Sequence, residues 1–401
     1  MIENKVLFIT SRNVINTCGE LRLIKNRTIA LHDEWNIKTD FIAYSNKQRD
    51  KKDKEGIGAN SSMIVCQYSK YNLADIIRTY ISVRKIAKKQ LKENKYSAIV
   101  LSGMLVLSLA KYFKNHYPKI EIIADIHGAS DELVEFKHKS SIKTTLNNLA
   151  YKVAMFEQKR SLPYCDSAFV VSEALRKYVL ERFKTNHLNF YIVPCSISRV
   201  EIDITNSLAL RNKWREELNI NTDELLFIYS GGTSAWQSID DANIVFQMIK
   251  ERMPKQKVHF LIMSHDSRKL QYLASNIVSI RSFKPHEVKD VLFAGDFAFL
   301  LRGDYITNNV AFPNKFIEYV MSGMQIISTP FVHDVADYIN NYKLGIIIES
   351  INESEINKII NNIANLSTAQ IKWTGRLALA NCLCFENTLN SFVKHLKTEN
   401  E

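Results

Sequence analysis

Three charged side chains, Arg302, Lys315 and Glu318, have the types and spacing of a site that binds an anion and a diol. An arginine and a lysine in a dry site stabilise a phosphate or diphosphate leaving group. A carboxylate accepts charge-assisted hydrogen bonds from neighbouring hydroxyl groups, each contributing roughly 1.5–3 kcal/mol. Lys315 and Glu318 are three residues apart, so a helix would place them on one face. The alternative is an ordinary amphipathic helix with a solvated Lys–Glu pair.

The elements that must position these side chains are a strand, a loop, a short helix and a second strand. The apolar run Phe297–Leu301 has strand length, and the polar segment 303–311 predicts a loop. Pro313 suits the first turn of a helix, where its missing N–H costs nothing. Gly323 suits the end of that helix, and 325–329 is apolar again. A helix N-terminus at the carboxyl end of a parallel strand attracts anions.

These residues resemble the donor-nucleotide motif of GT-B fold glycosyltransferases of family 4 (glycosyl transferases group 1), in the branch with Pro-x-Lys-x-x-Glu-Tyr. The matching positions are Arg302, Pro313, Lys315, Glu318, Tyr319 and Gly323. The resemblance implies that Glu318 binds the ribose hydroxyls of the donor and that the two cations hold its diphosphate. Many members carry another Glu eight positions before Glu318, where this sequence has Val310.

Two further segments are candidates for donor binding. Gly231-Gly232-Thr233-Ser234 follows a predicted strand, and small residues there let the backbone approach a phosphate or the sugar. A tight turn would explain the glycines as well. Family members often carry an Arg and a Lys in this loop, where Gly232 and Gln237 stand here. Phe283 lies in a segment that resembles the one contacting the donor base, or it is a partly buried aromatic at a strand end.

Candidates on the acceptor side lie in the first half of the chain. Asp125 and His127 follow a predicted strand and precede a glycine. The resemblance places a histidine here near the transferred sugar, where it could donate a hydrogen bond or assist developing charge. Asp125 is either a base or a cap for the following turn. Gly19 and Arg22 would bring a loop and a cation towards an anionic acceptor, or they begin a helix with exposed charges.

Strands alternate with helices in both halves of the chain, which predicts an α/β fold with doubly wound parallel sheets. The resemblance implies GT-B, in which two Rossmann-like domains face each other across a cleft. We expect an acceptor-binding domain at 1–200 and a nucleotide-sugar domain at 201–401, with the last helix packing back on the first domain. The predicted strands are Val6–Thr10, Phe41–Tyr44, Met63–Cys66, Ala98–Leu101, Ile120–Ala124, Phe169–Val171, Tyr191–Val193, Leu225–Tyr229, His259–Met263, Ile277–Ile280, Phe297–Leu301, Gln325–Ser328 and Gly345–Ile348.

The excess of basic residues bears on which kinds of partner the protein could bind. The 401 residues include 53 Lys and Arg against 42 Asp and Glu, a formal charge of +11. Many of the cations belong to the first half, and an amphipathic helix is predicted over Leu73–Lys92. Its basic residues suggest an anionic membrane surface as partner, or a solvated face. Its apolar residues Ile76, Ile77, Tyr80 and Ile81 are expected in the core. No nucleic-acid module is recognisable, and we expect no nucleic-acid partner.

The beginning of the sequence lacks a signal-peptide pattern, and six cysteines without a Cys-x-x-Cys pair suggest buried, reduced thiols. We therefore expect a cytoplasmic protein, held peripherally at the inner face of the cytoplasmic membrane if its acceptor is a lipid. No Asp-x-Asp motif and no His/Cys set at zinc spacing occurs, so we expect no metal and no cofactor.

The sequence therefore predicts a metal-independent, retaining glycosyltransferase of the hexosyltransferase type (EC 2.4). Its donor would be a UDP- or GDP-sugar, and its acceptor a saccharide or lipid-linked saccharide. Retention follows from the resemblance, and so does a role in bacterial capsule, O-antigen or exopolysaccharide biosynthesis. One alternative is another GT-B enzyme, such as a nucleotide-sugar epimerase. The other is a non-catalytic glycosyltransferase-like scaffold that only binds a partner.

Overall fold

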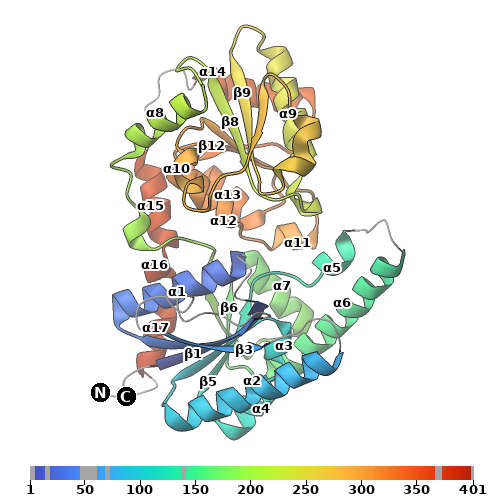
Figure 1. Cartoon of the computed structure of the whole chain (residues 1–401), viewed down its shortest axis with the longest axis vertical. Helices are drawn as coiled ribbons and strands as arrows, with labels where there is room; N and C mark the ends of the chain where they lie inside the picture. The colour runs from blue at the N-terminus through green and yellow to red at the C-terminus, as the bar shows by residue number, and fades with distance from the viewer. Residues whose placement is uncertain are drawn as a thin grey trace. The chain divides into compact units, whose positions relative to one another are not determined.

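The chain folds into two compact units, which we describe separately. In this computed structural model, residues 5–13, 19–45, 61–67, 73–136, 141–365 and 373–398 are described. Unit 1 comprises Met1–Arg199 together with Leu383–Glu401, and unit 2 comprises Val200–Cys382. The last helix, α17 (Asn390–Thr398), therefore belongs to unit 1 although it ends the chain (Figure 1).

Unit 1 is built on a parallel sheet of seven strands among its described residues, in the order β3-β2-β1-β4-β5-β6-β7. Its other elements are helices, which join the strands or follow them. The bounds are β1 (Lys5–Asn13), α1 (Gly19–Trp35), β2 (Lys38–Ser45), β3 (Ser61–Gln67), α2 (Leu73–Glu93), β4 (Ala98–Ser102), α3 (Met104–Leu107), α4 (Ala110–His116), β5 (Glu121–Ile126), α5 (Glu132–Glu135), α6 (Ser141–Ser161), η2 (Leu162–Tyr164), β6 (Ser167–Val170), α7 (Glu173–Phe183), β7 (Asn189–Ile192) and α16 (Phe385–Thr388).

Unit 2 is built on a second parallel sheet, whose six described strands run in the order β10-β9-β8-β11-β12-β13. The bounds are η3 (Arg199–Glu201), α8 (Ser207–Glu217), β8 (Leu225–Ser230), η4 (Ala235–Gln237), α9 (Ile239–Arg252), β9 (Val258–Met263), η5 (Ser267–Leu273), β10 (Val278–Arg281), α10 (Val288–Leu292), β11 (Phe297–Leu300), α11 (Ile306–Asn309), α12 (Asn314–Met321), β12 (Gln325–Ser328), α13 (His333–Tyr342), β13 (Gly345–Ile347), α14 (Glu353–Asn365) and α15 (Trp373–Leu383).

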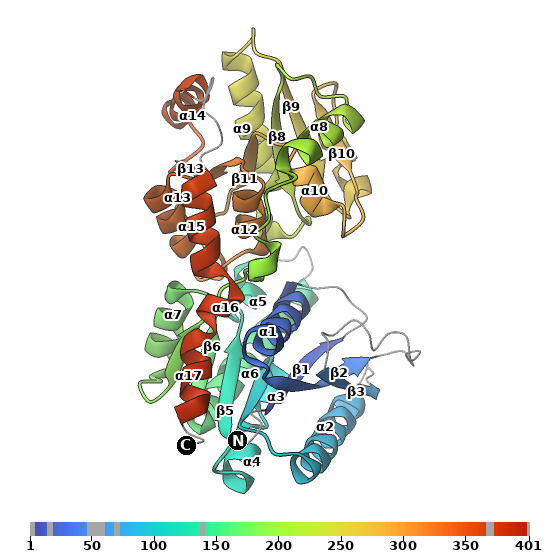
Figure 2. The ribbon, with the colours of Figure 1, turned by 90° about the vertical axis from the view of Figure 1, so that its left-hand side faces the viewer.

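Both units are doubly wound, as the sequence predicts. Strands of a parallel sheet are covered by helices on both faces, so they are continuously apolar rather than alternating. In β4 and β11 every residue is buried. Each of the thirteen predicted strands is confirmed, with its ends shifted by a few residues at most. In unit 1, α1 and α2 lie on opposite faces of the sheet (Figure 2).

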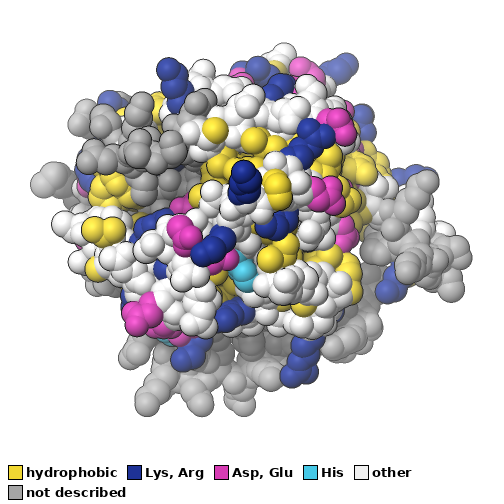
Figure 3. Space-filling view, turned by 90° about the horizontal axis from the view of Figure 1, so that it is seen from above, with side chains coloured by type: hydrophobic (Ala, Val, Ile, Leu, Met, Phe, Trp, Pro, Cys, Tyr) yellow, Lys and Arg dark blue, Asp and Glu magenta, His cyan; other side chains and the backbone are white. Residues whose placement is uncertain are grey.

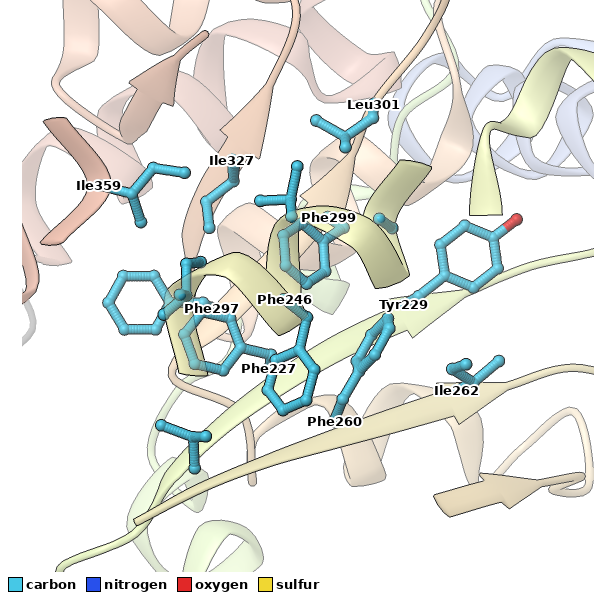
Figure 4. Close-up of a cluster of buried hydrophobic side chains, with 14 of the residues drawn as sticks. Phe227, Tyr229, Phe246, Phe260, Ile262, Phe297, Phe299, Leu301, Ile327 and Ile359 are labelled. Atoms are coloured by element: carbon cyan, nitrogen blue, oxygen red, sulfur yellow. The ribbon is translucent and has the colours of Figure 1, made fainter. Parts of the chain in front are cut away.

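Aromatic side chains fill the core of unit 2 (Figure 4). Phe227 stacks on Phe297 and Phe299, with ring centroids 4.9 and 5.7 Å apart. Phe246 from α9 packs on Phe227 and on Phe260, so the helix is fixed to the middle of the sheet. Burial of each ring contributes about 1.5–3 kcal/mol. This rigid core holds the carboxyl ends of β8 and β11 in place.

The structure corrects three expectations. Segment 303–311 is not a continuous loop, because α11 forms a short turn of helix within it. On α2, Ile77 and Ile81 are exposed, whereas Val83 and Ala87 are buried, so the core-facing side was assigned wrongly in part. Of the four described cysteines, Cys165 and Cys384 are buried but Cys382 is exposed. Within the described part of the chain, no helix combines the length and the apolar character needed to cross a bilayer.

Candidate functional site

The predicted donor-binding residues of unit 2, apart from Phe283, lie near the point where the order of its strands reverses. From β8 the chain continues outwards to β9, whereas β11 is the neighbour of β8 on the other side. At such a switch point the loops after two adjacent strands separate, and ligands of doubly wound sheets bind there. Gly231 directly follows β8, and Arg302 follows β11 with one residue between.

A side chain at the first position of the loop after β8 would collide with the ends of the Lys315 and Gln237 side chains, which would have to move. A Cβ atom on Gly231 would lie 1.8 Å from Nζ of Lys315 and 2.6 Å from Oε1 of Gln237. Its φ of 157° also lies in a region that L-residues rarely adopt. Gly232 has more room, since a Cβ there would approach other atoms no closer than 3.4 Å. The glycine at 231 therefore has a role that a turn alone would not require.

Gln237 joins the cations of the site to this loop. Its Oε1 accepts a hydrogen bond from the Lys315 ammonium, and its backbone oxygen accepts one of 3.1 Å from Nη1 of Arg302. The Tyr229 hydroxyl lies 2.8 Å from Oε1 of Gln237 and 2.8 Å from the oxygen of Gly232. The Lys315 ammonium lies 4.5 Å from the centroid of the Tyr229 ring. Gln237 thus contacts both cations, Lys315 through its side-chain amide and Arg302 through its backbone oxygen.

Neither cation has a carboxylate ion-pair partner among the residues that the structure describes. Arg302 is buried, and its guanidinium donates only to backbone oxygens, those of Leu301 and Gln237. Burial lowers the pKa of Arg302. Burial, with the neighbouring charge of Arg302, lowers the pKa of Lys315 well below its ordinary value. Buried positive charge costs free energy, which Glu318 offsets only in part at Lys315, and an anion in the site would offset more of that cost.

Helix α12 carries Lys315 and Glu318 and is fixed to the loop by Tyr319. Pro313 is its N-cap residue with ψ of 135°, one position earlier than the first turn that we expected. Phe316, Ile317, Tyr319, Val320 and Met321 are buried, and the Tyr319 hydroxyl accepts a 3.0 Å hydrogen bond from the backbone N–H of Ser230. The helix ends before Gly323, whose φ of 81° confirms the expected left-handed end. Glu318 lies partly exposed, one turn after Lys315.

Other predicted donor residues have structural partners of their own. The Thr233 hydroxyl donates to Oδ2 of Asp266 over 3.0 Å, and Ser234 accepts a backbone hydrogen bond from Gln237. Phe283 packs edge to face on Trp214 of α8, with centroids 5.9 Å apart. The described contacts of Phe283 do not bring it into the group around Lys315, so packing explains it without a ligand. Val310 is buried at the end of α11.

In unit 1 the structure joins Asp125 and His127 in a buried polar network. Nε2 of His127 lies 2.9 Å from Oδ2 of Asp125 and 3.0 Å from Oγ of Ser102. The other Asp125 oxygen accepts a 2.6 Å hydrogen bond from Nη1 of Arg27, whose Nη2 donates to the oxygen of Val193. Both partners of this ion pair are fully buried. Asp125 is therefore not a turn cap but the centre of an Arg–Asp–His arrangement.

Charge keeps Asp125 ionised. Burial alone would raise its pKa, but the charges and hydrogen bonds of His127 and Arg27 outweigh burial and hold the pKa well below its usual range. Nδ1 of His127 is buried and has no hydrogen-bond partner among the described residues. It can therefore form a hydrogen bond with a hydroxyl group of a ligand.

The acceptor-side prediction for Gly19 and Arg22 stays a prediction, and the structure adds Glu20 to it. Gly19 is the first residue of α1, and Arg22 is exposed on that helix. Glu20, between them, reaches the network: its Oε1 lies 3.3 Å from Oγ of Ser102 and 3.9 Å from Nε2 of His127. Sequence reasoning missed Arg27, Ser102 and Gln237 as parts of the two sites. Ser102 ends β4, the neighbour of β5, and pairs with Asp125 in the sheet. That position at a strand end is the one feature of Ser102 that could have suggested a place in the site.

Comparison with known proteins identifies the class of fold. Neither a family model nor a curated protein sequence matches this chain. Among solved structures, a glycosyltransferase from Rickettsia africae is 15% identical with a TM-score of 0.69, covering 100% of this chain and 99% of its own. HepE of Anabaena in complex with UDP is 12% identical with a TM-score of 0.67, covering 98% and 100%. Sucrose-phosphate synthase of Thermosynechococcus elongatus is 12% identical with a TM-score of 0.70, covering 98% of each chain. The two Rossmann-like units therefore form the GT-B fold.

A metal site is not apparent in the described part of the chain. No three His, Cys, Asp or Glu side chains are grouped there in a way that could hold a metal ion. Arg302, Lys315 and the start of α12 supply positive charge at the switch point of unit 2.

Proposed function

We propose that this protein is a glycosyltransferase that moves a sugar from a nucleotide-sugar donor to a saccharide or lipid-linked saccharide. The observation that carries the proposal is the pair of buried or partly buried cations, Arg302 and Lys315, which contact Gln237 beside a loop whose first residue, Gly231, leaves room for the Lys315 ammonium. A diphosphate supplies the missing negative charge. Structural relatives with the same fold support this choice, since HepE of Anabaena is described in complex with UDP and with UDP-glucose.

Each group in unit 2 then has a distinct role toward the donor. Arg302 and Lys315 bind the diphosphate, and Glu318 accepts hydrogen bonds from the ribose hydroxyls. Backbone N–H groups of Gly232 and Thr233 are free to approach the phosphates because no large side chain intervenes. The donor is a UDP- or GDP-sugar, and the reaction needs no metal ion.

The network of unit 1 acts toward the transferred sugar and the acceptor. Arg27 and Asp125 orient His127, and Nδ1 of His127 forms a hydrogen bond with a sugar hydroxyl. The reaction proceeds with retention by front-face displacement. The bond from the anomeric carbon to the diphosphate oxygen breaks, the acceptor oxygen bonds to the same face of that carbon, and the acceptor proton passes to the departing phosphate oxygen. The proposed setting is assembly of a bacterial surface polysaccharide.

Calorimetry with UDP and GDP, followed by a donor panel with and without acceptors, tests the proposal. We expect one nucleoside diphosphate to bind and its sugar derivative to be consumed only slowly without acceptor. Turnover of the donor to an isomer without acceptor would indicate an epimerase. Failure of both nucleotides to bind would overturn the donor site and leave a non-catalytic scaffold. Configuration of the product, read by NMR, tests retention.

A further inference from the structure

Helix α6 of unit 1 carries a row of large apolar side chains that points to solvent. Leu146, Leu149, Val153 and Phe156 are 60, 60, 49 and 61% exposed. They follow one another at spacings of three, four and three residues, which places them on a single side of the helix. We call these four residues the α6 stripe. Single exposed apolar residues are common on proteins, but a continuous row of four marks an interaction surface.

The opposite side of α6 already accounts for the attachment of the helix to unit 1. Ala154 is buried, Tyr151 donates a 3.3 Å hydrogen bond to Asp131, and Gln158 donates one of 2.6 Å to Ser130. Arg182 of α7 donates to the Tyr151 hydroxyl. Helix α6 runs along the outside of unit 1 (Figure 1). Helix α6 packs on unit 1 through the side that carries Ala154, and the α6 stripe lies on the opposite side. The stripe is therefore not the side by which α6 packs on unit 1.

Basic side chains border the α6 stripe. Lys152 and Lys159 are exposed along one edge, Lys143 lies on the other, and Arg160 places its guanidinium 5.9 Å from the centroid of the Phe156 ring. The only acidic residue of the helix, Glu157, pairs with Arg160 over 3.0 Å. An apolar row with cationic edges is the pattern of helices that lie in the interface of an anionic bilayer.

A second helix of the same face adds to this surface. Arg84 of α2 stacks on Tyr112 of α4, and Lys111 of α4 lies over Tyr164 of η2, the turn that follows α6. Helices α2 and α4 are therefore neighbours, and α4 also contacts the segment after α6, on one side of the sheet. Right-handed crossovers from β3 to β4 and from β5 to β6 require the same placement. Ile77 and Ile81 of α2 are 51 and 58% exposed, and Lys85, Lys88, Lys89 and Lys92 are exposed beyond them.

We propose that the α6 stripe, with the outer side of α2, docks unit 1 on a bilayer that contains anionic lipid. A second copy of this chain fits the surface less well, because a two-fold contact would bring two sets of the same basic residues, Lys143, Lys152, Lys159 and Arg160, into one interface. Apolar burial and attraction of about 1 kcal/mol per cation near the surface both favour the bilayer. On the face shown in Figure 3, basic side chains are instead scattered among acidic and uncharged ones. The inference is independent of the proposed transfer reaction.

Vesicle co-sedimentation tests the inference with the full chain. We expect binding to vesicles of phosphatidylcholine with phosphatidylglycerol, weak binding to phosphatidylcholine alone, and a decrease with added salt. The double variant Leu149→Ser, Phe156→Ser should lower vesicle affinity at least ten-fold and bind nucleotide normally. Lys152→Glu with Lys159→Glu should lower the affinity and flatten its salt dependence. The matched controls are Leu208→Ser and Lys255→Glu, which change exposed residues of unit 2 and should bind vesicles as the unaltered chain does.

Three results would overturn the inference. One is an unaltered chain that stays in the supernatant with anionic vesicles at low salt. Another is equal loss of binding in the Leu208→Ser control. The third is a dimer in light scattering that the Leu149→Ser, Phe156→Ser variant converts to monomer, because a second copy would then cover the α6 stripe. Loss of nucleotide binding would bear on the donor site of unit 2 and not on this surface.

Discussion

The Lys315 ammonium occupies the space that a side chain at Gly231 would need, with only 1.8 Å between Nζ and the position of a Cβ. Glycine at 231 is thus a condition for the position of Lys315. Gly231→Ala should displace Lys315 and lower the affinity for a nucleoside diphosphate at least ten-fold, as titration calorimetry would measure. Gly232→Ala is the matched control, since its Cβ has room, and should lower affinity by less than three-fold. Equal effects of the two changes would contradict this role of Gly231.

Binding of a diphosphate should be accompanied by proton uptake at Lys315. Burial and Arg302 lower the pKa of Lys315 in the free protein, whereas a bound anion raises it. Between the two pKa values the free site lacks a proton that the complex holds, so affinity falls as pH rises through that window. Calorimetry in two buffers of different protonation enthalpy measures the uptake. A pH well above the phosphate pKa of about 6 excludes titration of the ligand itself.

The control for this measurement is Lys315→Met, which should bind more weakly and show no such uptake. Lys255→Met changes an exposed lysine elsewhere in unit 2, and this variant should take up as many protons on diphosphate binding as the unaltered chain does. Equal heats in both buffers for the unaltered chain would show that Lys315 keeps its proton without ligand.

Glu318 should contribute to recognition of the ribose. Glu318→Gln removes the charge and keeps the shape, so each lost charge-assisted hydrogen bond should cost about 1.5–3 kcal/mol of binding free energy. The expected result is a ten-fold or larger loss of affinity for the nucleoside diphosphate, with unchanged affinity for inorganic diphosphate. The comparison of the two ligands is the internal control. A similar loss for both ligands would mean that Glu318 acts through Lys315 instead.

Breaking the buried pair of unit 1 should destabilise the protein. Arg27→Met leaves Asp125 buried with His127 alone and should lower the free energy of unfolding by about 3–5 kcal/mol, measured in urea. Arg176→Met removes a partly exposed pair with Glu173 and should cost less than about 1 kcal/mol. Adding Asp125→Asn to Arg27→Met should recover part of the loss. Additive losses would show that the two side chains are not coupled.

Asp125 also makes the free energy of unfolding depend on pH in the acidic range. Its pKa in the folded protein is held below the unfolded value of about 3.9, so its contribution is fully present above that value and is lost as pH falls below it. Urea titrations at a series of acidic pH values should show a steeper decline for the unaltered chain than for Asp125→Asn. Parallel declines would assign the acid sensitivity to other carboxylates.

Transfer should survive removal of divalent ions, since Arg302, Lys315 and the start of α12 supply positive charge to the diphosphate. Assays of donor consumption with excess EDTA and with added Mg²⁺ or Mn²⁺ would measure this. Complete loss in EDTA that either ion restores would show that a metal takes part.

Strands and cations could be predicted from the sequence because their signals are local. A strand covered on both faces is a short apolar run, as in Phe297–Leu301, and Lys315 and Glu318 are three residues apart in one helix. Arg27 and Asp125 are separated by 98 positions, so only the tertiary fold brings them together. In sequence, Arg27 is one of several cations on an amphipathic helix, and nothing local distinguishes a buried arginine from a solvated one. Gln237 is neutral, and in the sequence it only marks a difference from the family pattern that these residues resemble. Nothing in the sequence shows that it contacts both Lys315 and Arg302.

The apolar residues of α6 were equally ambiguous, because the pattern predicts a helix without stating which side meets the core. Helical periodicity identifies faces, and packing decides which of them is covered. The same reason explains the partly wrong assignment on α2, where Ile77 and Ile81 are exposed and Val83 is buried.

The place of α17 in unit 1 has a consequence for the order of folding during synthesis. Phe392 of α17 packs on Phe169 and Tyr191, with ring centroids 4.9 and 5.5 Å away, and the backbone N–H of Phe385 bonds to the oxygen of Ile197. These residues are synthesised only after the whole of Val200–Cys382 in unit 2. The first segment of unit 1 therefore waits for α17 to cover Phe169, whereas the continuous stretch of unit 2 can complete its own core earlier. A nascent chain stalled before residue 383 would present an open aromatic surface to chaperones.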